Sequence, residues 1–93
     1  MIVTYEDENL RKNDVLRIEV QQVFASDLSF AEDLAPSVRG NDRAMIIGWT
    51  QSARILEIGV EYFETEDREH IFHAMDAGKV YKEAFLKRIG QWQ

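Results

Sequence analysis

Residues Asn41 to Ala77 read NDRAMIIGWTQSARILEIGVEYFETEDREHIFHAMDA, and this stretch predicts three adjacent strands. The first, Arg43 to Thr50, is mostly apolar and is followed by a short polar turn. The second, Ile55 to Phe63, alternates apolar residues with others at the period of two that a half-buried strand shows. The third, Arg68 to about Met75, returns after a charged hairpin tip. We therefore expect an antiparallel meander.

Two helices are predicted ahead of the meander. Thr4 is a candidate capping residue, which places a short helix from Tyr5 to about Lys12. A second helix, Val15 to Ala25, begins from Asp14 and carries an apolar stripe at helical spacing. The stripe consists of Leu16, Val20, Val23 and Phe24. We expect this apolar stripe to pack against a sheet.

An edge strand and a closing helix complete the predicted fold. Leu28 to Leu34 alternates weakly, and the following Pro36 excludes a central place in a sheet. Lys79 to Ile89 has a helical pattern, which Gly90 is placed to end. The order of elements predicts one α+β domain over residues 1–93, with two N-terminal helices, a four-stranded antiparallel sheet and a C-terminal helix.

The composition excludes several classes of chemistry. None of the 93 residues is cysteine, so disulfides and cysteine-based metal sites are excluded. No window approaches the roughly eighteen apolar residues of a membrane span, and the N-terminus lacks the basic and apolar regions of a secretion signal. We expect a cytoplasmic protein without a metal or cofactor.

The charge is acidic overall but basic in the last helix. The net charge of −6 opposes attraction to nucleic acid or to an anionic membrane. The predicted closing helix nevertheless holds Lys79, Lys82, Lys87 and Arg88 against Glu83. These cations either complement the dipole of the helix C-terminus or form a face that binds anions.

Several short motifs follow one another in order along the chain. They are Asn9-Leu-Arg-Lys-Asn-Asp-Val, Val23-Phe24, Asp42-Arg43, Ile47-Gly48, Arg54-Ile-Leu, Val60 and His70-Ile-Phe-His-Ala-Met-Asp-Ala. Their order and spacing resemble the BrnT-like toxins of type II toxin-antitoxin systems, over nearly the whole chain. The resemblance implies a RelE-like fold, metal-independent cleavage of RNA and a cognate antitoxin protein as partner.

The departures from the family pattern fall on polar positions. The family usually has Lys-His-Gly where this chain has Lys12-Asn13-Asp14, and Arg-Ile-Ile-Ser-Ala-Arg where it has residues 70–75, His-Ile-Phe-His-Ala-Met. Two arginines and a histidine are therefore replaced, whereas Arg43 is retained. A ribonuclease must bind phosphate and stabilise charge on the transferring phosphoryl group, so these losses predict a degenerate site.

His73 is the candidate general acid or base, because imidazole titrates near neutrality. Arg43 and Lys79 are the candidate phosphate-holding partners in catalysis, and Lys82 and Arg54 are expected to bind substrate. The alternative is that His73 is a half-buried structural histidine on its strand.

The spacing His70-x-x-His73 also raises the question of a metal site. In a regular strand, Ile71, His73 and Met75 share one face and His70 the other, so the histidines meet only if the backbone bulges. We therefore expect no metal. Glu57 and Glu61 share one face of their strand and are interpreted as a solvated face.

Two functional hypotheses follow. The first is a toxin-like ribonuclease whose activity is blocked by an antitoxin covering the sheet and the last helix. The second is a non-catalytic module of the same fold that binds a protein or forms a homodimer, favoured by the acidic balance, the lost cations and the aromatic content.

Overall fold

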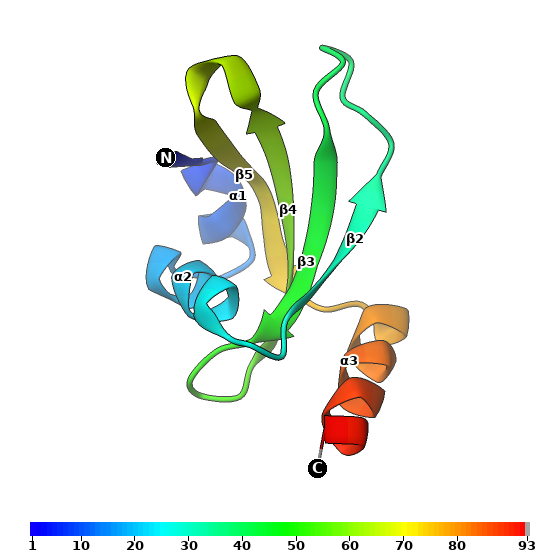
Figure 1. Ribbon diagram of the computed structural model, residues 1–93. Helices are drawn as coiled ribbons and strands as arrows, with labels where there is room; N and C mark the ends of the chain where they lie inside the picture. Colours follow the sequence, from blue (N-terminus) through cyan, green and yellow to red (C-terminus); the bar gives the residue numbers. More distant parts are fainter. Residues whose placement is uncertain (93) are drawn as a thin grey trace.

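The computed structural model describes residues 1–92 and shows an α+β domain, which confirms the predicted class (Figure 1). The elements in chain order are β1 (Ile2–Tyr5), α1 (Asp7–Lys12), α2 (Arg17–Ala25), β2 (Phe30–Leu34), β3 (Arg43–Trp49), β4 (Ile55–Phe63), a 3-10 turn (Glu64–Glu66), β5 (Arg68–Asp76) and α3 (Lys79–Trp92). Within residues 1–92, no helix is long and apolar enough to cross a membrane.

The sheet is mixed and has five strands, in the order β1-β5-β4-β3-β2. Strands β2 to β5 form the predicted antiparallel meander. The prediction of four strands, all antiparallel, is wrong because β1 pairs in parallel with β5. Four residues are too few for a period of two to stand out. Thr4, predicted as a helix cap, lies inside β1 with its Oγ1 2.7 Å from Nδ1 of His70.

Helices α1 and α2 cover one face of the sheet and form the main core with it (Figure 1). The buried side chains of this core are Leu10, Val15, Val20, Val23, Leu56, Ile58, Val60, Ile71 and Ala74. The apolar positions predicted on β4 are thus confirmed. The α2 stripe is narrower than predicted, since Leu16 is 63% exposed and the helix begins only at Arg17.

Two asparagines, one in α1 and one directly after it, continue the hydrogen bonding of β5 beyond the end of β1. The last backbone bond on this side joins Glu6 N to the Ile71 carbonyl at 2.8 Å. Asn9 Nδ2 then donates to Phe72 O at 2.7 Å, and Asn13 Nδ2 donates to Ala74 O at 3.0 Å. Because the two asparagines are four residues apart, they lie on one side of the helix. They satisfy carbonyls that would otherwise lack partners.

A β-bulge in β5 changes which side chains share a face. Gly59 pairs with His73 while Val60 pairs with Ile71, so Phe72 is the extra residue. The ring of Phe72 lies over Gly59, where an added Cβ would come within 2.7 Å of Phe72 Cζ. The prediction that the two histidines lie on opposite faces is wrong, because His70 and His73 pair with Glu61 and Gly59, which are two residues apart on β4.

Helix α3 packs on β3, at the end of the sheet face opposite to α1 and α2 (Figure 1). Its buried residue is Phe85, whose ring lies 5.6 Å from that of Trp49 in an edge-on arrangement. Arg88 donates to the Leu28 carbonyl at 2.7 Å and so ties the helix to the segment before β2. The helix continues through Gly90 to Trp92, contrary to the predicted end at Gly90.

Candidate functional site

The sheet face opposite to α1 and α2 carries both histidines, and we call it the histidine face. Its charged side chains come from strands β2 to β5. They are Glu32 on β2, Arg43 on β3, Glu57 and Glu61 on β4, and Arg68, His70 and His73 on β5.

His73 is hydrogen-bonded to Glu57, with 2.9 Å between Nε2 and Oε2. The other carboxylate oxygen, Oε1, accepts the backbone N–H of Gly78 at 2.7 Å. The two side chains are 29% and 12% exposed, respectively. A carboxylate accepts, so Nε2 of His73 is the donor of this bond; in the neutral tautomer that carries its proton on Nε2, Nδ1 holds a lone pair. This nitrogen can accept a proton from a bound hydroxyl group.

Arg43 lies on the same face, opposite Glu61 in the register of β3 and β4. Its guanidinium is 5.5 Å from the ring centroid of Phe72, the residue before His73. Its Nε donates to the Ala35 carbonyl at 2.9 Å, which fixes the direction of the side chain. Among the residues described, no carboxylate forms an ion pair with Arg43. Its remaining donors can therefore meet an anion.

Lys79 and Lys82 are exposed in the first turns of α3. Lys79 directly follows Gly78, whose N–H binds Glu57, so the start of α3 is attached to the His73–Glu57 pair. Over residues 1–92, no hydrogen bond or ion pair joins either lysine to His73 or Arg43. The lysines are at the edge of the histidine face rather than on it.

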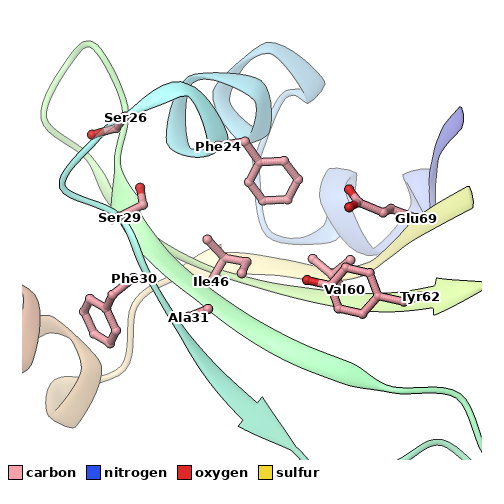
Figure 2. A pocket seen from close by; sticks show the side chains of 9 residues that line it. All are labelled: Phe24, Ser26, Ser29, Phe30, Ala31, Ile46, Val60, Tyr62 and Glu69. Carbon is pink, nitrogen blue, oxygen red and sulfur yellow. The ribbon is translucent and has the colours of Figure 1, made fainter. Parts of the chain in front are cut away.

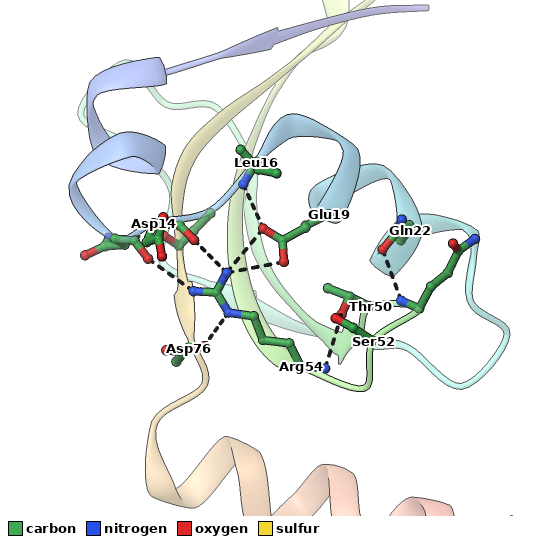
Figure 3. A network of polar contacts seen from close by, with 11 residues as sticks. Asp14, Leu16, Glu19, Gln22, Thr50, Ser52, Arg54 and Asp76 are labelled. Atoms are coloured by element: carbon green, nitrogen blue, oxygen red, sulfur yellow. Dashed lines mark hydrogen bonds and ion pairs between the residues drawn. The ribbon is translucent and has the colours of Figure 1, made fainter.

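Arg54 lies in a different environment, between the start of β4 and the two N-terminal helices (Figure 3). It binds Asp76 through Nε at 2.7 Å, and Glu19 through Nη1 at 3.2 Å. The same guanidinium donates to the backbone carbonyls of Asp14 at 2.6 Å and Asn13 at 3.2 Å. These contacts describe a structural arginine, apart from His73 and Arg43.

His70 is engaged in a contact between β1 and β5. Thr4, whose Oγ1 is hydrogen-bonded to His70, also accepts from Nη1 of Arg68 at 3.1 Å. The Arg68 guanidinium lies 4.0 Å from the ring centroid of Phe63. Within the described part of the chain, no group of three or more His, Cys, Asp or Glu side chains is placed to hold a metal ion.

Glu61 is a buried carboxylate, contrary to the interpretation of its strand face as solvated. Arg39 donates to it twice, from Nη2 to Oε1 at 2.8 Å and from Nε to Oε2 at 3.1 Å. Asn41 Nδ2 adds a third bond at 2.9 Å. The Arg39 hydrogen bonds, followed by those from Asn41 and Ser37, lower the pKa of Glu61 from 4.5 to about 2 against the opposing effect of burial. The loop between β2 and β3 is thereby bound to the histidine face.

This lowered pKa predicts a loss of stability in acid. The contribution of Glu61 is present above pH 4.5, its ordinary pKa, and is lost as the pH falls toward about 2. Because Arg39 is 60% exposed and its charge is screened by solvent, we expect a loss of only about 1–2 kcal/mol. Urea unfolding across this pH range checks it. Glu61→Gln should flatten the pH dependence, whereas the exposed control Glu8→Gln should not; an unchanged slope in Glu61→Gln would contradict the assignment.

No protein-family model matches the chain, and no curated protein matches it at a significant level. The candidate site residues lie on the histidine face, as its geometry indicates. Of the side chains predicted at a site, the fold brings His73 and Arg43 to this face and leaves Lys79 and Lys82 at its edge. Glu57 was not predicted as a partner of His73. Its place opposite Met75 follows from the bulge, for which the only sequence signal is the glycine at position 59 inside the strand.

Proposed function

We propose that this protein is a toxin-like endoribonuclease of a toxin-antitoxin pair, which binds RNA across the histidine face. The observation that carries the proposal is the His73–Glu57 hydrogen bond, on the same sheet face as Arg43. Nδ1 of His73 takes the proton of a ribose 2′-hydroxyl, and the 2′-oxygen attacks the adjacent phosphorus. The bond from phosphorus to the 5′-oxygen breaks, leaving a 2′,3′-cyclic phosphate, and the departing oxygen receives a proton from the imidazolium or from water.

The cations complete this scheme. Arg43 has donors free for a phosphate oxygen and lies against Phe72, next to the base. Lys79 and Lys82 extend positive charge along the start of α3, where a strand of RNA leaving His73 would pass. The charge that develops on the transferring phosphoryl group is stabilised by these side chains.

Two backbone positions support the family resemblance. Asp14 stands where the family usually has glycine, and its φ of 56° is in the left-handed region that glycine adopts readily. Gly48, in the Ile-Gly motif, has no space for a side chain, since an added Cβ would lie 2.0 Å from Ser29 Oγ and 2.9 Å from Val23 Cγ1. Both positions require a small or glycine-like residue for structural reasons, which accounts for these motifs without any assumption about activity.

The alternative is a non-catalytic module of the same fold that binds a protein or forms a homodimer. The favouring observation is Met75, which pairs with Glu57 where the family usually has an arginine. The thioether of Met75 supplies no positive charge beside the His73–Glu57 pair. Together with the net charge of −6, this predicts weak binding of RNA at physiological salt.

An RNA-cleavage assay separates the two functions. We expect the purified protein to cleave a single-stranded RNA at low salt in the presence of EDTA, to give 2′,3′-cyclic phosphate ends, and to leave a DNA of the same sequence intact. DNA is the matched control because it lacks the attacking 2′-hydroxyl. Co-expression with the product of an adjacent small reading frame should relieve growth arrest. A protein that neither binds nor cleaves the RNA and does not arrest growth has the alternative function.

A further inference from the structure

An open groove lies on the helix-covered face of the sheet, away from the histidine face (Figure 2). It has a volume of about 300 Å³ and runs between the C-terminal end of α2 and strands β2 to β5. Ile46 and Val60 form its apolar floor. Phe24 projects from α2 toward the sheet (Figure 2). The ring of Tyr62 and the carboxylate of Glu69 lie at the far end of the groove. The helices therefore leave part of this face uncovered.

The charge of the groove is negative. Glu69 is half-buried, and among the residues described it has no ion-pair partner. Tyr62 pairs with Glu69 across β4 and β5. Burial, followed by the charges of Glu69 and Asp33, raises the pKa of the Tyr62 phenol. None of the groove-lining side chains is basic. A phosphate group would be repelled here, so the groove is unsuited to RNA.

The aromatic side chains give the groove a second attraction for cations. Phe24 is 37% exposed, so an incoming group can reach its ring. Aromatic faces attract ammonium and guanidinium groups, and the aliphatic stems of lysine and arginine pack well on apolar surfaces. An apolar floor, aromatic walls and an uncompensated carboxylate together match a long cationic side chain better than a neutral apolar one.

We propose that this groove binds a lysine or arginine side chain of a partner protein, with Glu69 as its counter-ion and Phe24 and Tyr62 packed on its stem. Charge complementarity selects this occupant, because Glu69 is the charged side chain of the groove lining. Arg88 lies 5.9 Å from the ring of Phe30, which is away from Glu69 (Figure 2), and is bonded to the Leu28 carbonyl. The site lies on the opposite side of the sheet from His73. It therefore stands or falls independently of RNA cleavage.

The probe is the capped tripeptide acetyl-Leu-Arg-Leu-amide, titrated into the full chain while amide chemical shifts are recorded. We expect shifts at Phe24, Ile46, Tyr62 and Glu69, and an affinity near 1 mM, about −4 kcal/mol. The matched peptide with glutamine in place of arginine should bind at least about threefold more weakly, since it lacks the charge. Glu69→Gln should lower the affinity for the arginine peptide by a similar factor, whereas Glu8→Gln on exposed α1 should leave it unchanged.

Any of the following results would overturn the proposal. They are the absence of shifts at the groove with the arginine peptide, equal binding of the two peptides, unchanged affinity in Glu69→Gln, and shifts of the groove residues on dilution of the protein alone. The last result would identify a second copy of the chain as the occupant. Polyuridylate is titrated into the protein in a separate experiment. Chemical-shift changes at the groove residues with this RNA would also contradict the proposal.

Discussion

Replacement of His73 by glutamine is expected to slow RNA cleavage about 10²- to 10⁴-fold, the usual contribution of a general base. This corresponds to a rise of about 3–5 kcal/mol in the activation barrier. Glutamine has about the same length and can still hydrogen-bond to Glu57, but it cannot take up the 2′-hydroxyl proton. Single-turnover cleavage of one RNA by wild-type and variant proteins measures the effect.

Glu57 tests whether His73 works in one tautomer. The carboxylate holds the Nε2 proton, so Glu57→Gln would allow the ring to place its proton on Nδ1 instead. We expect this variant to lose at least about tenfold in rate, the size of effect seen when orienting partners are removed. Because Glu57 acts through His73, the loss should fall on the rate of cleavage and leave RNA binding unchanged. The exposed Glu8→Gln is the matched control.

Circular dichroism and urea unfolding accompany these variants, since His73 is half-buried. Cleavage at the wild-type rate by a folded His73→Gln protein would rule out the assigned base. If neither variant folds, His73→Asn replaces them in the cleavage assay, because asparagine is smaller than glutamine and still polar. A variant that binds RNA as tightly as the wild type but cleaves it slowly gives the expected separation of binding from chemistry.

Much of the fold is readable from the sequence because β4 alternates strictly. Leu56, Ile58 and Val60 are buried on the core face, as their spacing predicts. The strand β1 is missed because its pairing with β5 joins residues about 66 positions apart, a relation that no local pattern records. Thr4 is compatible with a helix cap by residue type, and only the contact with His70 shows its role in a strand.

The site was less predictable because it depends on one extra residue. Counting back from the hairpin tip without a bulge would pair His73 with Ile58, on the core face. The bulge at Phe72 moves His73 opposite Gly59 and turns it toward Glu57. Gly59 makes room for the Phe72 ring, so the placement of the histidine follows from a contact between two strands. A glycine inside a strand is the available signal for such an irregularity.

Replacement of Arg54 by methionine is expected to lower the free energy of unfolding by about 2–4 kcal/mol, because partly buried partners would be left unsatisfied. The arginine side chain is 25% exposed and Glu19 is 17% exposed. Its guanidinium joins Asp76 at the end of β5 to Glu19 on α2 and to two carbonyls after α1 (Figure 3). Methionine keeps most of the stem but none of these bonds.

Urea unfolding of Arg54→Met, with Arg11→Met as the control, measures this loss. Arg11 is exposed on α1, and its replacement removes the same charge. Arg54→Lys should recover only part of the stability, because an ammonium group cannot bond to a carboxylate and two carbonyls in the fork geometry of a guanidinium. A change within about 0.5 kcal/mol for Arg54→Met would show that the network contributes little. RNA binding by the folded Arg54→Lys protein separates the two roles of Arg54. Weaker binding than the wild type, with unchanged binding by Arg11→Met, would show that Arg54 contacts the substrate. Equal binding would leave Arg54 the structural role that its four hydrogen-bond partners indicate.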